Sequence, residues 1–363
     1  MYRIGLVGAG WISKVYARAL QRVPEGRAVG VCARRRESAE RFAGEFGLEV
    51  ASDSLDELLR HVDVVCINSP NARHAEQAIR AAEAGRHVIV EKPLATTAAE
   101  GRALVEACRR AGVGLAYAEE LPFVPKFVRA REIARSGALG EIRYLTQREA
   151  HAGPHSPWFF SRDEAGGGVL MDMACHSIEC VRWLLGKPPC LRVSAQLAAG
   201  RDGTRLEDHA VVHLAFAGGA SALCEASWAL RGGMQSRLEV WGTRGTLAAD
   251  LLHETGLRVA SEEPRGGAVP GWTPQASDWL WENGYPQELS HFLRAFRDGA
   301  EPQESGEDGV RVLEILEAAY ASARGGRVVA VPHALPPVER AVDLWLGAGA
   351  PGPGAIEPEG RAS

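Results

Sequence analysis

Residues 4–13 read Ile4-Gly5-Leu6-Val7-Gly8-Ala9-Gly10-Trp11-Ile12-Ser13 and constrain the architecture of this 363-residue chain more than any other segment. A glycine turn lies directly between an apolar strand and an amphipathic helix, where the dinucleotide pattern G-x-G-x-x-G belongs. Gly8 allows the tight turn, and Gly10 lets backbone N–H groups approach a pyrophosphate at the positive end of the helix. Ser13 replaces the third glycine with another small residue. The segment therefore predicts a nucleotide-binding turn.

Strands and helices alternate around this turn through the first third of the chain, which is typical of parallel βαβ units. The predicted strands are residues 3–7, 28–32, 63–68, 87–90 and 114–117. The predicted helices are residues 11–23, 37–46, 55–60, 74–84 and 97–111. We therefore expect residues 1–120 to form a doubly wound α/β domain with a parallel sheet.

The pattern changes after residue 120 to longer alternating strands with few helices between them, which predicts a mostly antiparallel open sheet. Predicted strands are residues 142–149, 210–216, 220–228 and 237–241, and predicted helices are residues 126–135, 172–185, 287–297 and 310–323. We expect residues 121–340 to form an α+β domain for substrate binding and oligomerisation. Residues 341–363 are rich in Gly, Pro and Ala and are expected to be a loosely held tail.

Composition limits the classes of function. The chain is 46% hydrophobic and 24% charged, and its 41 Lys+Arg against 46 Asp+Glu give a formal charge of -5. Without a basic block, neither a nucleic acid nor a membrane surface is the expected partner. No apolar run reaches the ~18 residues of a spanning helix. The seven scattered cysteines form no C-x-x-C pair, as in a reducing cytoplasm. A small molecule in the cytoplasm remains the expected partner.

The end of the second predicted strand bears on cofactor choice. A carboxylate there would bind the ribose 2′-OH of NAD, but the sequence reads Cys32-Ala33-Arg34-Arg35-Arg36 without Asp or Glu. Guanidinium groups suit the dianionic 2′-phosphate, so we favour NADP over NAD. The alternative interpretation is a solvated basic start to the helix at residues 37–46, because arginine runs are common at helix ends.

Two further motifs carry side chains suited to chemistry. Glu91-Lys92-Pro93-Leu94 follows a predicted strand, and the carboxyl end of a parallel strand lies at the ligand-binding edge of an open sheet. Asp172 and His176 follow the triglycine Gly166–Gly168 at an i, i+4 spacing, which puts both side chains on one face of a helix. A histidine there can exchange a proton with a hydroxyl group, and a nearby carboxylate would orient its ring and favour its protonated form.

Taken together, these motifs and the Asn68-Ser69-Pro70-Asn71 segment with His74 resemble the Gfo/Idh/MocA family of oxidoreductases, which includes glucose-fructose oxidoreductase and inositol dehydrogenase. The resemblance spans residues 4–332. It implies a Rossmann domain, a second open-sheet domain, and hydride transfer between nicotinamide and a sugar, polyol or inositol-like alcohol. Lys92, Asp172 and His176 match the catalytic trio of the family.

The resemblance also implies roles for individual residues. Lys92 would polarise the reacting oxygen, His176 would exchange its proton, and Asp172 would bind substrate and tune His176; which of Lys92 and His176 is the terminal base stays open. The expected cofactor-binding residues are Gly8, Gly10, Trp11, Ile12, Ala33, Arg34, Arg35, Asn68, Ser69, Pro70, Asn71, His74, Glu91 and Lys92. The expected substrate-binding residues are Lys92, Glu120, His151, His155, Trp158, Asp172 and His176.

The sequence departs from the family pattern at three positions. Glu120 and Pro122 stand where relatives often carry Asn and Arg, so local contacts there are expected to differ. Glu179 replaces the aspartate of an H-x-x-D pattern and keeps a carboxylate.

Between Lys92 and Asp172, the side chain of Trp158 or Phe159 could stack on a sugar ring or could be ordinary packing, and the sequence favours neither interpretation. A metal site of Glu149, His151, Asp172 and His176 is chemically possible, but no tight ligand motif demands it and we expect no metal. Trp228 and Trp241 are interpreted as sheet residues.

Two rival functions remain open. One is a redox-neutral glycosidase of the same family, which would retain its cofactor without net production of NAD(P)H. The other is a non-catalytic nucleotide-sensing regulator, although such a protein has no need of Lys92, Asp172 and His176 together. A large open sheet seldom leaves a face bare, so a homodimer or homotetramer is expected.

Overall fold

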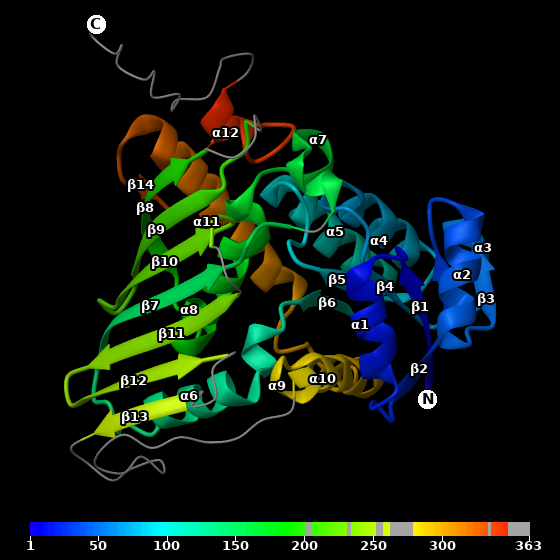
Figure 1. Cartoon of the computed structure of the whole chain (residues 1–363), viewed down its shortest axis with the longest axis horizontal. Coiled ribbons are helices and arrows are strands. Elements are labelled where there is room, and N and C mark those ends of the chain that lie inside the picture. Colours follow the sequence, from blue (N-terminus) through cyan, green and yellow to red (C-terminus); the bar gives the residue numbers. More distant parts are fainter. Residues whose placement is uncertain are drawn as a thin grey trace, which may run out of the picture.

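The computed structural model describes residues 1–154, 156–199, 205–230, 234–251, 257–261, 279–332 and 335–347. It contains a parallel sheet, called sheet A, and a mostly antiparallel sheet, called sheet B, with helices between them (Figure 1). This arrangement confirms the predicted combination of a doubly wound domain and an open-sheet domain.

Sheet A has the strand order β3-β2-β1-β4-β5-β6, and its neighbouring strands pair in parallel. This is the order of a dinucleotide-binding sheet, in which ligands bind at the carboxyl ends where the order reverses, between β1 and β4. The strands are β1 (Tyr2–Val7), β2 (Gly26–Cys32), β3 (Val50–Ser52), β4 (Val64–Ile67), β5 (His87–Glu91) and β6 (Leu115–Ala118). Only β3 was not predicted, because its three residues are too short to show a pattern.

Helices pack on both faces of sheet A. Leu58 of α3 and Leu104 of α5 join the core on one face, and Val15 of α1 and Phe42 of α2 join the core on the other. The apolar strands buried between them explain why β4 reads as a continuous hydrophobic run. The helices are α1 (Trp11–Leu20), α2 (Arg36–Phe46), α3 (Leu55–Leu59), α4 (His74–Glu83) and α5 (Ala98–Ala111), with a 3-10 turn η1 (Asn71–Arg73).

Helix α10 (Tyr285–Asp298) returns from late in the chain to cover sheet A beside α1 (Figure 1). Its Leu289, Phe292 and Phe296 are buried in the same core as Ile4. The segment falls within the predicted second domain, but its apolar side chains are buried against sheet A. The core beneath the glycine turn therefore depends on residues from both halves of the chain.

Sheet B has the order β13-β12-β11-β7-β10-β9-β8-β14. Its described pairs are antiparallel except for β7 with β10. The strands are β7 (Ile142–Ala150), β8 (Cys190–Ala198), β9 (His209–Phe216), β10 (Ser221–Ser227), β11 (Gln235–Gly242), β12 (Gly245–Asp250), β13 (Leu257–Ser261) and β14 (Val329–Ala330). The sequence analysis predicted four of these and missed β8, β12, β13 and β14.

Helices lie against one face of sheet B, and no described helix covers the opposite face (Figure 1). The strands alternate accordingly, with Leu145 buried and its neighbours Tyr144 and Thr146 only half-buried. The remaining helical elements are η2 (Leu121–Phe123), α6 (Pro125–Arg135), η3 (Pro157–Phe160), α7 (Arg162–Ala165), the π-helical turn η4 (Leu170–Ala174), α8 (Cys175–Leu184), α9 (Trp279–Glu282), α11 (Gly306–Gly325) and α12 (Asp343–Leu346).

The start of the expected loose tail is packed. Ala341, Val342 and Trp345 are buried, and the N–H of Ala341 donates to the carbonyl oxygen of Thr96 at 3.2 Å. The apolar run in α12 packs against α11, which corrects the expectation of a loose tail from residue 341. Residues 348–363 lie outside the described part of the chain.

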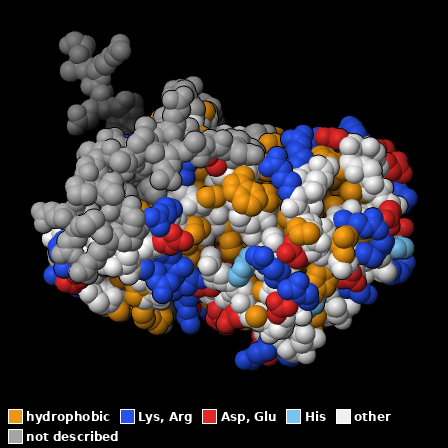
Figure 2. All heavy atoms as spheres, turned by 90° about the horizontal axis from the view of Figure 1, so that it is seen from below, with side chains coloured by type: hydrophobic (Ala, Val, Ile, Leu, Met, Phe, Trp, Pro, Cys, Tyr) orange, Lys and Arg blue, Asp and Glu red, His pale blue; other side chains and the backbone are white. Residues whose placement is uncertain are grey.

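The surface carries charges of both signs. On the face seen in Figure 2, basic, acidic and apolar side chains are interspersed. Of the helices within the described ranges, none combines the length and the apolar character needed to cross a membrane.

We predict that Phe292→Ala lowers the free energy of unfolding by about 3–5 kcal/mol, because it leaves a cavity beneath sheet A. Phe292 is fully buried and packs edge-on against Phe123, with ring centroids 5.5 Å apart. Urea denaturation measures the change, and Arg294→Ala on the exposed face of the same helix is the control. A loss no larger than that of the control would contradict the assignment of α10 to this core.

Candidate active site

A cavity of about 320 Å³ lies between the carboxyl edge of sheet A and the η4–α8 segment of the second domain. Most of the predicted site residues line it. These are Gly10, Trp11, Ile12, Asn68, Ser69, Asn71, His74, Glu91, Lys92, Glu120, His151, Trp158, Asp172 and His176. The cavity is also lined by Tyr285 and by Phe159, for which stacking was left open. Its remaining lining residues were not predicted from the sequence: Gly153, Pro154, Ser156, Met173 and Met234.

The glycine turn has the geometry that its sequence predicts. Gly8 has a φ of +107°, and a Cβ there would lie 2.6 Å from the carbonyl oxygen of Asn68. The Ser13 hydroxyl donates to the Gly8 carbonyl oxygen at 2.7 Å and accepts from Asn68 Nδ2 at 3.2 Å. The residue that replaces the third glycine therefore closes the turn with hydrogen bonds.

The turn also leaves room for an anion. A Cβ on Gly10 would meet nothing within 4 Å, and no side chain caps the start of α1. Asn68 Oδ1 is buried and lacks a hydrogen-bond partner in the described structure. The Trp11 side chain begins the helix with 51% of its surface exposed. A helix start without a side-chain cap and with an open approach is what a dinucleotide pyrophosphate requires, so the residues present fit such a cofactor.

The arginines after β2 lie away from the cavity. Arg34 and Arg35 are exposed, and neither makes an ion pair with a described residue, whereas Arg36 pairs with Glu40 at 3.2 Å. At the end of the neighbouring strand β3, Asp53 follows Ser52, which pairs with Cys32 at the end of β2. Burial, and then the charge of Asp53, raises the pKa of Cys32 to about 11. The end of β2 therefore lies near the carboxylate of Asp53 and the guanidinium group of Arg80, which have opposite effects on the pKa of Cys32.

Lys92 connects the two domains. Its Nζ donates to the Asp172 backbone oxygen at 2.7 Å and to Asp172 Oδ1 at 2.9 Å. Burial lowers the pKa of Lys92, but Asp172, Cys175 and Glu91 together outweigh burial and the pKa lies above its ordinary value. The ammonium group is therefore charged and held in place at the cavity wall.

Asp172 is held by partners from separate elements. Trp228 Nε1, just beyond β10, donates to Asp172 Oδ2 at 2.9 Å, and His151 Nε2 lies 3.6 Å from the same oxygen. Burial raises the pKa of Asp172, but Lys92 and His151 outweigh burial and the pKa lies below its ordinary value. The sequence analysis interpreted Trp228 as a sheet residue and missed this contact, for which the sequence gives no signal.

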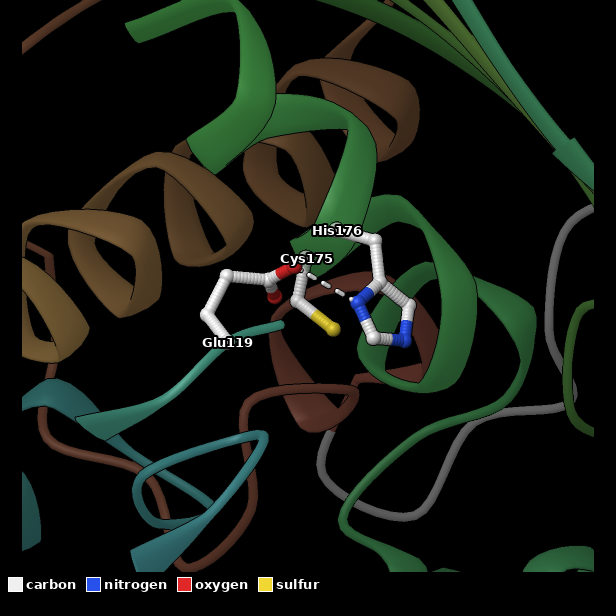
Figure 3. A group of neighbouring side chains, drawn as sticks. All are labelled: Glu119, Cys175 and His176. Carbon is white, nitrogen blue, oxygen red and sulfur yellow. Dashed lines mark hydrogen bonds and ion pairs between the residues drawn. The ribbon is translucent and has the colours of Figure 1, made fainter. Parts of the chain in front are cut away.

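His176 is held by Glu119 and not by Asp172. Figure 3 shows the Glu119 side chain reaching from the end of β6 toward the imidazole, with the thiol of Cys175 beside them. His176 Nδ1 lies 2.8 Å from Glu119 Oε1, and the possible ligand atoms of Glu119, Cys175 and His176 all lie within 4.8 Å of one another. Burial raises the pKa of the Cys175 thiol well above its ordinary value, and the sulfur donates to the Asp172 backbone oxygen at 3.3 Å.

The electrostatics of His176 correct the expectation that a carboxylate would favour its protonated form. Burial lowers the pKa of His176 to about 4, more than the neighbouring Glu120 raises it. Burial also raises the pKa of Glu119 to about 8. Asp172 lies in the π-helical turn and His176 in the regular helix, so the angle between their side chains is not that of an ideal i, i+4 pair.

Several predicted residues tie the cavity walls together. The two ring nitrogens of His74 lie 2.8 Å from the carbonyl oxygens of Pro93 and Ser69. Asn71 Nδ2 donates to the Ala165 carbonyl oxygen at 2.9 Å and so connects sheet A to α7.

Other candidates lie elsewhere. Glu149 does not line the cavity and accepts from Gln147 Nε2 at 2.7 Å and from the Ser236 hydroxyl. Glu179 is fully buried and pairs with Arg182. Gly8, Ala33, Arg34, Arg35 and Pro70 do not line the cavity, and His155 lies outside the described residues.

Comparisons with known proteins identify relatives of both domains. Residues 2–119 match the model of the oxidoreductase family with an NAD-binding Rossmann fold, and residues 127–248 match the GFO/IDH/MocA C-terminal domain. Inositol 2-dehydrogenase of Rhizobium meliloti (strain 1021) is 30% identical over 339 residues, which cover 91% of this chain and 99% of the relative.

Solved structures show the same arrangement of domains. GenD2 from gentamicin A biosynthesis, in complex with NAD, is 35% identical with a TM-score of 0.82 and matches 91% of this chain and 96% of its own. Levoglucosan dehydrogenase in complex with NADH is 27% identical with a TM-score of 0.81 and matches 91% of this chain and 99% of its own. Because both domains match in chain order and the relatives align over nearly their full length, the chain belongs to the Gfo/Idh/MocA family of NAD-binding oxidoreductases.

Proposed function

We propose that the protein transfers a hydride between a nicotinamide cofactor and an alcohol carbon of a sugar, polyol or cyclitol. The observation that carries this proposal is that the Lys92 ammonium group, the His176 imidazole and the glycine turn line one cavity of about 320 Å³. The names of the relatives, which include an inositol 2-dehydrogenase and a levoglucosan dehydrogenase, support this class of substrate.

The cofactor would be held by the turn at Gly8 and Gly10, the start of α1 and the Asn68 side chain, and when bound it supplies the hydride donor or acceptor. Lys92 has three N–H donors, of which two are used by Asp172. The third is available to the oxygen of the reacting carbon. Because Asp172 keeps the ammonium group charged, Lys92 stabilises negative charge that develops on this oxygen.

His176 exchanges the proton of that oxygen. Its Nδ1 is occupied by Glu119, which leaves Nε2 as the ring atom able to reach substrate. When Glu119 is ionised it accepts from Nδ1–H, and Nε2 is then a lone-pair acceptor for the proton of an alcohol. When Glu119 is protonated it donates to Nδ1, and Nε2–H is then a donor to a carbonyl oxygen. Glu119 is thus a positioning residue that selects the tautomer of His176.

For the cofactor we propose a preference for NADP. Arg34 and Arg35 are exposed at the end of β2, and no carboxylate follows this strand directly. They can reach toward a 2′-phosphate with bidentate geometry.

We further propose a cytoplasmic homo-oligomer. All seven cysteines are free and buried, which supports a reducing compartment. On the face of sheet B without a described helix, the rings of Tyr144 and Trp241 lie 5.3 Å apart and half-buried Leu223 is nearby, a surface suited to a second copy of the chain.

Lys92→Met is expected to lower kcat for alcohol oxidation by about 10²- to 10⁴-fold, because the charge facing the reacting oxygen is lost. Cofactor fluorescence titration is expected to give a dissociation constant within about threefold of the wild type, since the turn is intact. Lys14→Met, which removes an exposed pair with Glu45, is the control. Retention of full turnover in Lys92→Met would refute the proposed role.

The pH dependence follows from the raised pKa of Glu119. Below about pH 8 Glu119 is protonated and Nε2 of His176 carries a hydrogen, so alcohol oxidation is slow. Above about pH 8 Glu119 is ionised, and Nε2 can accept the proton of the alcohol. We expect initial rates of oxidation to rise with pH through about 8, and rates of carbonyl reduction to fall over the same range. Glu119→Gln is expected to remove this step from both profiles, whereas exposed Glu132→Gln leaves it. An unchanged step in Glu119→Gln would disprove the tautomer mechanism.

Cofactor preference is measured by titration with NADH and NADPH. Arg34→Ala is expected to weaken NADPH binding by about tenfold, the value of one charge-assisted contact, with little change for NADH. Arg36→Ala, which loses ion pairs with Glu40 and Glu57, is the matched control. Wild-type binding of NADH without binding of NADPH would overturn the preference.

A further inference from the structure

The cavity has more carboxyl groups than cations. Glu91, Glu120 and Asp172 line it, and Lys92 is the only lysine or arginine among its described lining residues. Glu119 lies immediately behind His176 and is fully buried. Carboxyl groups in a poorly hydrated site are costly unless they are paired, so each of them calls for a partner.

Three of these carboxyl groups have partners within the protein. Asp172 pairs with Lys92, Glu119 is bound to His176 Nδ1, and Glu91 accepts from the backbone N–H of Lys92 at 2.9 Å. Burial nevertheless raises the pKa of Glu91 to about 8.

Glu120 differs from the other three. Its side chain is 17% exposed, and its carboxyl group lies 3.5 Å from Nδ1 of His176, whose pKa of about 4 leaves the imidazole neutral. That nitrogen is already engaged by Glu119 at 2.8 Å. Burial raises the pKa of Glu120, and Glu119 adds to the rise; His176 and Lys92 lower the pKa but do not cancel the effect of burial. The Glu120 carboxyl group therefore lines the cavity, and it makes few of the hydrogen bonds that its two oxygens could accept within the described structure.

A carboxyl group can bind sugar hydroxyls, but hydroxyl recognition does not require one at this position. An uncharged amide can accept from or donate to a sugar hydroxyl without the desolvation cost of a carboxylate. A cation recovers that cost, because an ammonium–carboxylate contact in a low-dielectric site is much stronger than a contact between neutral groups.

We propose that Glu120 binds an ammonium group of the substrate, so that the alcohol oxidised or formed belongs to an amino sugar or aminocyclitol. This inference rests on the proposed function and specifies the substrate class of the same site. The ammonium group lies near His176 when bound, so the reacting alcohol is carried on the same ring as the amine or on a directly linked one. Glu120 is ionised in that complex, and the bound ammonium group lowers the pKa of its carboxyl group.

The test compares matched pairs of substrates with the cofactor-loaded enzyme. The pairs are D-glucosamine with D-glucose, 3-amino-3-deoxy-D-glucose with D-glucose, and scyllo-inosamine with scyllo-inositol. We expect the wild type to favour at least one amine over its hydroxyl partner by about tenfold in kcat/KM. Glu120→Gln is expected to lower this ratio by about tenfold or more, and Glu132→Gln, an exposed glutamate, is expected to leave it unchanged.

A second readout is specific to the charge of Glu120. Calorimetric titration of the preferred amine, at a series of pH values and in buffers of different ionisation enthalpy, is expected to report proton release in the pH range in which Glu120 of the free enzyme titrates, and its loss in Glu120→Gln. A role of Glu120 in packing alone would not produce this difference.

Three results would overturn the inference. One is equal or better use of every hydroxyl partner by an enzyme that turns over neutral polyols, which leaves the proposed function intact. A second is a Glu120→Gln variant in which the ratio of the affinities for NAD⁺ and NADH changes but the preference for amines does not. Glu120 would then balance the positive charge of the oxidised cofactor and not that of a substrate. Failure to bind any nicotinamide cofactor would remove the proposed function and this inference together.

Discussion

The ion pair of Lys92 and Asp172 joins the two domains at the point where the cavity forms. Lys92 follows a strand of sheet A, and Asp172 lies in the π-helical turn against sheet B. A buried pair of charges is stable only when the remaining hydrogen-bonding capacity is used. Here the Asp172 backbone oxygen and Trp228 Nε1 provide those additional bonds. The relative position of the two domains and the charge of Lys92 are thus set by the same contacts.

The π-helical turn gives Asp172 and His176 different partners, whereas in a regular helix residues four positions apart lie on the same face. Asp172 faces Lys92 and Trp228, whereas His176, one turn later, faces Glu119 at the end of β6. The charged pair of Lys92 and Asp172 and the pair of Glu119 and His176, which is neutral below about pH 8, therefore lie side by side at one cavity. The charged pair suits stabilisation of an oxyanion, and the neutral pair suits transfer of a proton.

Much of the fold could be predicted from the sequence because its local signals agree with one another. The strand before Gly8, the turn and helix α1 were predicted from ten residues, and the structure confirms all three. Strand β14 has only two residues, so its pattern could not be recognised. Helix α10 was predicted correctly as a helix, but its place on sheet A depends on which apolar surface was left uncovered.

The sequence by itself determined the nucleotide-binding turn, the position of Lys92 at the edge of a parallel sheet, and the membership of Asp172 and His176 in one site. Only the tertiary structure decided which carboxylate meets which base. Glu119 and His176 are separated by 57 residues, and Asp172 and Trp228 by 56. The first contact arises when the two domains pack together and the second when η4 packs on sheet B, and no periodicity along the chain records either of them.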